Sequence, residues 1–253
     1  MSVNPVAAGG FASAAPTYAR IRPTYARSSI GEVKDAIGTS ATVLDLAAGT
    51  GILTGQLTRA GLQLLAVEPV AEMLSQLQRS LPAVPALRGV AEQLPFAAAS
   101  VDAVVVGTAF HWFDGPTAAA EAARVLRDGG VLALLWNQRD DSVDWVRRYG
   151  EILLSERPQG RPYENADWEA VVAATSSFGP VERSSHANPQ PSSPTALVQR
   201  ASSTSFVADA PPEQRARVLD RVRDLAESHP ELSGRTRFDL PYVTELYLWR
   251  RSS

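Results

Sequence analysis

The chain has 253 residues, of which 45% are hydrophobic and 20% are charged, and this composition excludes disordered, collagenous and coiled-coil proteins. Its 24 Lys and Arg residues and 27 Asp and Glu residues give a formal net charge of -3, too little positive charge for a dedicated nucleic-acid-binding protein. Cysteine is absent, which excludes disulfides, thiolate zinc sites and cysteine nucleophiles.

The sequence also lacks the patterns of a membrane protein. No apolar run approaches the roughly 18 residues of a membrane-spanning helix. Residues 1–16 are rich in Ala, Gly and Ser, without the basic region and the continuous apolar region of a signal peptide. We therefore expect a soluble, cytoplasmic protein, a monomer or homodimer, whose partner is a small molecule rather than nucleic acid or a membrane.

The first predicted elements alternate between strand and helix. A polar-aromatic segment over residues 17–27 leads into a predicted helix that ends at Ile37. Apolar runs then alternate with helix-like stretches from residue 41 to residue 136, which is the pattern of a parallel sheet covered by helices. The predicted strands are Ala41–Leu46, Gln63–Glu68, Val84–Gly89, Val101–Val106 and Gly130–Trp136. The predicted helices are Ile52–Ala60, Val70–Ser80 and Thr117–Leu126.

The pattern changes after residue 140. Residues 142–174 are predicted to be helical with a break at residues 157–163, and Val181–His186 is a predicted strand. The turn residues of Asn188–Pro194 predict a loop. An amphipathic helix is predicted over Pro211–Ser228 and a half-buried strand over Tyr242–Trp249.

Together these elements predict one α/β domain over residues 1–253. Its Rossmann-like sheet would have seven mostly parallel strands, the last two forming a C-terminal antiparallel hairpin. Residues 17–140 would form the ligand-binding core, and residues 241–253 would hold the last strand. Residues 141–240 would supply a helical cover over the substrate region, together with one strand of the sheet.

A glycine-rich turn follows the first predicted strand. In the sequence VLDLAAGTG, the strand ends at Asp45 and runs into Gly49, Thr50 and Gly51 before a helix. Glycines let the backbone approach a ligand closely. The unpaired N–H groups at the start of the helix suit a carboxylate or phosphate. The alternative interpretation is a plain connection between strand and helix.

A second acid, Glu68, ends the next strand 23 positions after Asp45. A carboxylate there can accept hydrogen bonds from both ribose hydroxyls of a nucleoside. Thr54 occupies the position where a dinucleotide fingerprint has its third Gly or Ala. Asp45 would also suit an ammonium or sulfonium cation better than a pyrophosphate. These residues favour S-adenosylmethionine (SAM) over a dinucleotide.

Several motifs resemble the class I SAM-dependent methyltransferases, and within them the UbiE/type 11 group. These motifs are Asp45–Gly51, Glu68–Pro69, Gly89–Phe96, Ser100–Val105 and Arg124–Val131. Two further motifs, Tyr18–Tyr25 and Ala109–Asp114, resemble the trans-aconitate methyltransferase-like subgroup. The similarity covers about residues 17–136, and Tyr242–Trp249 resembles the last strand of the family.

The resemblance implies a set of cofactor-binding residues. Asp45 to Gly51 would hold the methionine moiety, Glu68 the ribose, and Met73 would pack near the adenine. Two departures are Ala47, in place of the first glycine of the fuller signature, and Val90, in place of an acid. With Tyr18 and Arg22 as caps over the cofactor, the full set is Tyr18, Arg22, Asp45, Ala47, Gly49, Thr50, Gly51, Glu68, Pro69, Met73, Ala91, Glu92, Thr108 and Ala109.

The segment after the fourth predicted strand is the candidate acceptor site, because open α/β sheets bind ligands beyond the carboxyl ends of their strands. We interpret Tyr25, His111, Trp112 and Phe113 as substrate-binding residues. His111 is also the candidate catalytic base for a protonated acceptor. In the alternative interpretation, His111 only orients the loop, since a carboxylate acceptor needs no base at neutral pH.

The predicted function is transfer of a methyl group from SAM to a small molecule through a carboxylate, hydroxyl, amine or carbon atom. The main alternative is a SAM-fold protein that does not methylate, either a cyclase-like enzyme or a SAM-binding module. A nicotinamide-dependent oxidoreductase and a nucleic-acid methyltransferase are disfavoured. We expect no metal, because no two histidines have the spacing of metal ligands.

Overall fold

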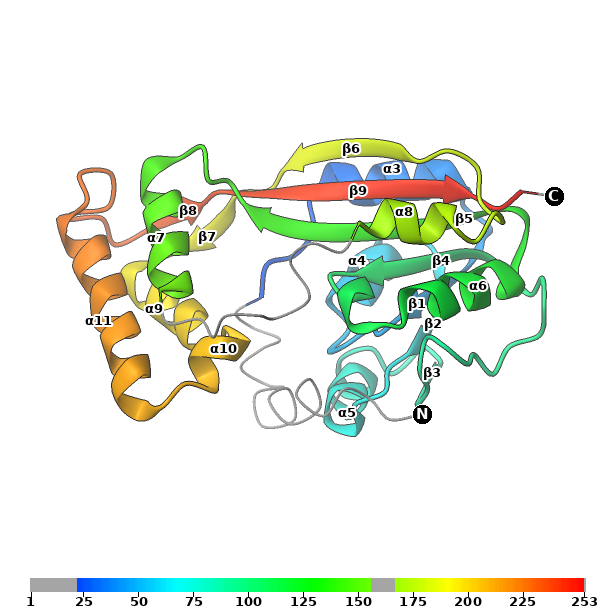
Figure 1. The fold of residues 1–253 in the computed structure, drawn as a ribbon, viewed down its shortest axis with the longest axis horizontal. Helices are drawn as coiled ribbons and strands as arrows, with labels where there is room; N and C mark the ends of the chain where they lie inside the picture. The colour runs from blue at the N-terminus through cyan, green and yellow to red at the C-terminus, as the bar shows by residue number, and fades with distance from the viewer. Residues whose placement is uncertain (1–21, 156–166, 253) are drawn as a thin grey trace.

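The computed structural model describes residues 22–155 and 167–252. Its main sheet has seven strands in the order β3-β2-β1-β4-β5-β9-β6 (Figure 1). The neighbouring pairs from β3 to β5 are parallel, and β9 is antiparallel to β5 and β6. The predicted mostly parallel sheet is therefore confirmed. The strands are β1 (Thr42–Leu46), β2 (Gln63–Val67), β3 (Ala86–Leu87), β4 (Val101–Gly107), β5 (Leu126–Arg139), β6 (Glu182–Ala187) and β9 (Tyr242–Arg250).

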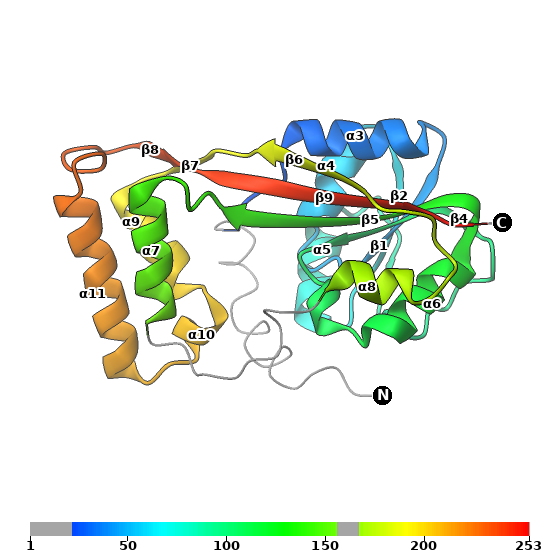
Figure 2. The ribbon, with the colours of Figure 1, turned by 45° about the horizontal axis from the view of Figure 1, so that its top comes forward.

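Helices cover both faces of this sheet (Figure 2). One face packs against α3 (Arg27–Ile37), α4 (Ile52–Arg59) and α5 (Ala71–Ser80), and the other against α6 (Gly115–Val125) and α8 (Trp168–Ala173). Successive side chains of a strand point to opposite faces. Val43 accordingly joins the cluster that contains Leu57 of α4, whereas Leu44 joins the cluster that contains Ala119 of α6. Burial of both faces explains why the central strands are apolar throughout.

A helical lobe lies beyond the carboxyl end of β5 (Figure 1). It consists of α7 (Asp144–Leu154), α9 (Pro194–Ser202), α10 (Ser205–Ala208) and α11 (Pro212–Ser228), with the short strands β7 (Gln190–Ser192) and β8 (Phe238–Leu240) beside them. Its buried apolar side chains form a cluster of their own that includes Trp145, Tyr149, Leu197 and Val222. The long strands β5 and β9 connect this lobe to the sheet.

Several sequence predictions need correction. The predicted loop over residues 188–194 is wrong, because Gln190–Ser192 forms β7 and pairs with β8. Pro191 weakens the strand pattern in the sequence, yet it is tolerated because, among the described residues, β7 has a strand on one side only. The strand predicted over residues 84–89 is only the two residues of β3, and the helix predicted from residue 117 begins at residue 115.

The last two strands of the sheet, β6 and β9, form the predicted antiparallel pair. Residues 188–241 between them fold into the helices and short strands of the lobe, and α11 (Pro212–Ser228) occupies the place of the predicted amphipathic helix. The predicted helical break at residues 157–163 lies outside the described residues. Within the described ranges, no helix has both the length and the apolarity needed to cross a membrane.

The turn between β1 and α4 depends on Gly51. This residue caps the helix in the left-handed conformation, with φ +87°. A Cβ atom at this position would lie 3.0 Å from Cγ of Leu77 and 3.1 Å from Cδ1 of Leu81. Gly49 also has a positive φ of +59°, but a Cβ atom there would meet no atom within 4 Å. Both glycines therefore have a positive φ that disfavours other residues, but only Gly51 is also packed closely against neighbouring side chains.

We expect Gly51→Ala to lower the free energy of unfolding by about 2 to 4 kcal/mol, because backbone strain and overpacking against α5 add together. The matched variant Gly49→Ala carries the backbone strain alone, which costs about 1 to 2 kcal/mol. Urea unfolding of both variants without ligand measures the two losses. Equal losses would contradict the close packing of Gly51 against Leu77 and Leu81.

Candidate active site

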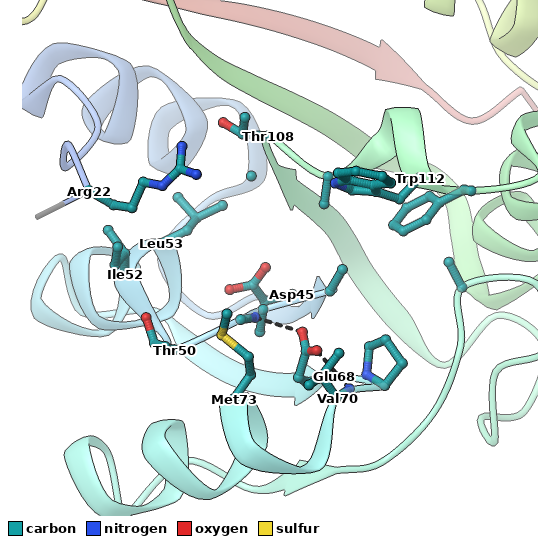
Figure 3. Close-up of a pocket in the computed structure, with 18 of the residues that line it drawn as sticks. Arg22, Asp45, Thr50, Ile52, Leu53, Glu68, Val70, Met73, Thr108 and Trp112 are labelled. Atoms are coloured by element: carbon teal, nitrogen blue, oxygen red, sulfur yellow. Dashed lines mark hydrogen bonds between the residues drawn. The ribbon is translucent and has the colours of Figure 1, made fainter. Parts of the chain in front are cut away.

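A cavity of about 1050 Å³ opens at the carboxyl ends of β1, β2, β4 and β5 (Figure 3). Its walls come from the turns that follow these strands, from the start of α4 and from the segment that precedes α3. Ligands of open α/β proteins bind at this edge of the sheet. Small-molecule sites commonly enclose about 300 to 1000 Å³, so the cavity has room for a cofactor and a second small molecule.

The structure brings most of the predicted site residues to the wall of this cavity. They are Arg22, Tyr25, Asp45, Ala47, Gly49, Thr50, Glu68, Pro69, Met73, Ala91, Glu92, Thr108, Ala109, Trp112 and Phe113. Gly51 and His111 do not line the cavity. Tyr18 lies outside the described residues. Residues predicted to bind the cofactor and residues predicted to bind the acceptor thus line the same cavity.

Asp45 is a buried carboxyl group at the end of β1, with only 1% of its surface exposed. Its Oδ2 atom accepts a hydrogen bond of 2.6 Å from the Thr54 hydroxyl, whereas its buried Oδ1 atom has no hydrogen-bond partner among the residues that the structure describes. Burial raises the pKa of Asp45 to about 7, the Thr54 bond opposes this rise, and the charge of Glu68 adds to it. An acceptor without a donor on the wall of a cavity suits a cationic group of a ligand.

Glu68 is clamped by the backbone at the end of β2. Its Oε2 atom accepts from the Gly49 N–H and its Oε1 atom from the Val70 N–H, both at 2.8 Å, as the dashed lines in Figure 3 mark. Burial raises the pKa of Glu68, and these two hydrogen bonds partly offset the rise. Each carboxylate oxygen keeps a further lone pair. The clamp therefore fixes a carboxylate whose remaining acceptor positions suit the two hydroxyls of a ribose.

Thr54 has a function in the site that the sequence analysis missed. The sequence used Thr54 only to disfavour a dinucleotide, but the structure buries it fully and directs its hydroxyl to Asp45. The residue lies in the first turn of α4, and only the three-dimensional fold brings its hydroxyl to the carboxyl group at the end of β1. The sequence did contain a signal for this role: Thr54 is polar at a position where close packing of helix against strand usually requires Gly or Ala.

A tyrosine from the N-terminal segment covers the end of β4. The Tyr25 and Thr108 hydroxyls lie 3.1 Å apart, and a Cβ atom on Gly107 would lie 2.5 Å from the Tyr25 hydroxyl. Glycine is therefore required at position 107 for this close approach. On the other side of the site, Oε1 of Glu92 accepts from the Asp114 N–H at 2.9 Å and ties the two loops together.

Aromatic residues form the wall that follows β4. Trp112 lines the cavity, and its ring lies 4.8 Å from the ring of His111. His111 in turn lies 6.4 Å from Trp168, which stacks on Trp136. Burial and the charge of Arg22 lower the pKa of His111 to about 4, so its imidazole is neutral at physiological pH. The role of His111 as a base stays a prediction.

Sequence reasoning did not predict the polar far wall of the cavity, which consists of Asn137, Gln138, Arg139, Asp141 and Tyr242. The predicted strand ended one residue before Asn137, whereas β5 continues to Arg139 because β9 pairs with it over this whole length. Polar residues directly after a buried strand, at its carboxyl end, were the signal that could have found them. Ala48 also lines the cavity, within the turn predicted to hold the methionine moiety. The other lining residues without a predicted role are Pro23, Ile52, Leu53, Val70, Gly89, Val90, Gly107, Asp114 and Thr117.

A network of amide and hydroxyl groups holds the N-terminal segment at this far wall. Nδ2 of Asn137 and Nδ2 of Asn188 donate to the Thr24 carbonyl at 3.1 and 2.6 Å. The Thr244 hydroxyl donates to Oδ1 of Asn137 at 2.6 Å, and Oε1 of Gln190 accepts from the Thr24 N–H at 3.1 Å. Residues on either side of Thr24 are thereby fixed as part of the cavity.

Comparison with known proteins identifies the family. Residues 44–134 match a family profile described as a methyltransferase domain. A protein of Mycobacterium tuberculosis named an uncharacterized methyltransferase is 41% identical over 234 residues, 92% of each chain. Another protein of that description from Schizosaccharomyces pombe is 29% identical over 213 residues, 84% of each chain. The chain belongs to the methyltransferase family.

Solved structures agree with the fold. A protein of Anaeromyxobacter dehalogenans, provisionally named a type II methyltransferase, superposes with a TM-score of 0.67 at 22% identity over 91% of this chain and 97% of its own. A Haemonchus contortus phosphoethanolamine N-methyltransferase in complex with S-adenosylhomocysteine gives 0.57 at 15% identity over 97% of this chain and 57% of its own. With the family established, the protein is a SAM-dependent methyltransferase of the class I fold.

The pKa of Asp45 predicts a pH-dependent affinity for the cofactor. The ionised carboxylate of Asp45 attracts a cation, and protonation removes this negative charge as the pH falls through 7. We expect the affinity for S-adenosylhomocysteine (SAH) to fall by about fivefold to tenfold between pH 7.5 and pH 6, with proton release on binding at neutral pH. Calorimetric titration in two buffers of different ionisation enthalpy measures both effects.

The matched control is Asp45→Asn, which keeps an acceptor for Thr54 but has no charge. Because folding raises the pKa of Asp45 from 3.8 to about 7, its ionisation lowers stability progressively between these pH values and fully above pH 7. This variant should therefore melt at a higher temperature than the natural protein at pH 8. It should also bind SAH more weakly at pH 8 and show a flatter pH dependence. A natural protein whose affinity does not change with pH would contradict the assignment of Asp45 to the cation.

Proposed function

We propose that the protein transfers the methyl group of SAM to a small-molecule acceptor bound between the aromatic wall and the far wall of the cavity. The observation that carries this proposal is the pair of buried carboxylates at one end of the cavity, with Glu68 clamped by two backbone N–H groups and Asp45 keeping one oxygen unpartnered. SAM, when bound, supplies a methyl group on a sulfonium that a nucleophile can attack directly.

The cofactor end fits this group by its donor and acceptor chemistry. Asp45 presents a carboxylate oxygen to a cation, and Glu68 presents two fixed oxygens to neighbouring hydroxyls. Met73 and Val90 line the cavity and add apolar surface for a base. A pyrophosphate would instead meet two buried acids, which disfavours a dinucleotide.

The acceptor end supports a role in positioning. Methyl transfer is a displacement at carbon, so its rate depends on alignment of the acceptor with the sulfonium. Trp112, Phe113 and Tyr25 give this end rigid aromatic walls, and Asn137 adds a polar group. This arrangement favours a small molecule. We also propose membership of the trans-aconitate methyltransferase-like subgroup, because the sequence segments Tyr18–Tyr25 and Ala109–Asp114 resemble it.

Parallel titration with SAM, SAH and NAD tests the cofactor assignment. We expect the first two alone to bind, and Glu68→Ala to weaken their binding by about 1 to 3 kcal/mol, because the ribose hydroxyls lose their acceptor. Glu72→Ala, at an exposed acid on α5, is the matched control and should leave the affinity unchanged. Binding of NAD alone, or unchanged affinity in the Glu68 variant, would overturn the assignment.

An acceptor screen then separates a methyltransferase from a SAM-fold protein that does not methylate. SAH and a methylated product must appear together in equal amounts if the proposal is correct. Binding of SAM without any loss of its methyl group, over acceptors of all four chemical classes named above, would favour the binding module. Conversion of the substrate to a new product while SAM keeps its methyl group would favour a cyclase-like enzyme.

His111 has two possible roles that kinetics can separate. If it takes a proton, His111→Ala should lower kcat while SAH affinity stays the same, and the pH profile of kcat should lose its acidic limb. If it only holds Trp112, the loss should appear in KM and the shape of the pH profile should persist. Equal kcat and KM in the variant and the natural protein would leave His111 with neither role.

A further inference from the structure

Two arginines and two tyrosines form a cluster where the far wall meets the helical lobe. Arg139 of β5 and Tyr242 of β9 are direct register partners. The Arg139 guanidinium lies over the Tyr149 ring at 5.7 Å from its centroid, and the Arg200 guanidinium lies over the Tyr242 ring at 5.6 Å. The Tyr149 hydroxyl also donates to the Leu197 carbonyl, one turn before Arg200 on α9, at 3.4 Å. We call these four side chains the arginine–tyrosine cluster.

Both guanidinium groups keep hydrogen-bond donors that no described residue accepts. Within residues 22–155 and 167–252, Nε of Arg139 and both Nε and Nη1 of Arg200 are buried without a hydrogen-bond partner. Among the residues that the structure describes, neither arginine forms an ion pair with an acid. Arg124 and Arg147, by contrast, pair with Glu121 and Asp144. Buried donors normally find an acceptor, and Arg139 lines the cavity, so its guanidinium points to a ligand that supplies one.

We propose that the acceptor carries an anionic group, a carboxylate or a phosphate, which Arg139 binds at the far wall while Arg200 adds positive charge from behind Tyr242. This inference rests on the proposed function, since it assigns the substrate class of the same cavity. Arg139 and Tyr242 line the cavity, whereas Arg200 does not. Arg139 therefore contacts the anion. Arg200 is a positioning residue: its positive charge attracts the anion from a distance, and its guanidinium packs on the ring of Tyr242, which lines the cavity.

The position of Arg139 assigns the anion to the acceptor rather than to the cofactor. Leu135 of β5 pairs with Gly107 at the end of β4, and Arg139 lies four residues further along the strand, about 13 Å at the rise of an extended chain. Asp45 and Glu68 end β1 and β2, which β4 separates from β5 in the sheet. The arginine is therefore remote from the two carboxylates of the cofactor end.

The charges around the cluster are mainly positive. Burial raises the pKa of Tyr149, the neighbouring Tyr242 raises it further, and the charges of Arg139, Arg200 and Arg22 lower it. These opposing effects place three cations near one phenol. Asp141 is the acid of the far wall, but it is exposed and forms no ion pair with Arg139 within 4 Å in the described chain. A ligand anion would thus meet a net positive charge.

Titration of the SAH-loaded protein with small probes tests this subsite. The probes are succinate and inorganic phosphate, with succinamide as the neutral equivalent of succinate. We expect one or both anions to bind and succinamide not to bind. Arg139→Gln should weaken anion binding by about tenfold or more, since a charge-assisted pair is lost, and Arg200→Gln by about threefold. The preferred anion distinguishes a carboxylate from a phosphate subsite.

Three controls keep the outcomes distinct. Arg147→Gln, at an exposed arginine of α7, should leave anion binding unchanged, and Arg139→Lys should recover part of it because it restores the charge but not the planar fork. SAH affinity should be unchanged in every variant. Equal anion binding by the Arg139→Gln variant, absence of anion binding by the natural protein, or a parallel loss of SAH affinity would overturn the subsite. Failure of the natural protein to bind SAH would instead overturn the proposed function.

Discussion

Two carboxyl groups buried at the ends of neighbouring strands constrain the rest of the site. Charged groups lose hydration when they are buried, and this cost raises the pKa of both Asp45 and Glu68. The protein compensates with the Thr54 hydroxyl at one acid and with two backbone N–H groups at the other. These requirements determine the side chain at position 54 and the course of the turn around Gly49. They also leave one oxygen of Asp45 for a cation from the ligand.

The two ends of the cavity are built by different parts of the fold. The parallel core supplies the cofactor end, where strands stop and turns begin. The far wall exists because β5 and β9 continue past the core as an antiparallel pair and join the helical lobe (Figure 1). That pairing sets Arg139 opposite Tyr242 and brings α9 close to both through Arg200. In the proposed function, specificity for the acceptor can therefore vary in the lobe while the cofactor end stays the same.

The sequence predicted the cofactor end well because that end depends on local order. Asp45, the glycine turn and Glu68 occupy fixed places in a βαβ unit, so their spacing alone brings them together. The far wall could not be predicted in this way. The length of β5 is set by its pairing with β9, about 110 positions later. The residues around Asn137 do not indicate where β9 lies, so they cannot predict how far β5 extends. The strand β7 was missed for the same reason, since in the described chain it pairs only with the distant strand Phe238–Leu240.

The distance between Asp45 and a bound cofactor is the most direct test of this account. A crystal structure of the protein with SAH, collected at pH 8, would measure it. We expect the ammonium group of SAH to lie within hydrogen-bond distance of Oδ1 of Asp45, and both ribose hydroxyls to lie within hydrogen-bond distance of Glu68 while its bonds to Gly49 and Val70 persist. A bound SAH that leaves Oδ1 of Asp45 without a partner, or that places its ribose away from Glu68, would contradict it.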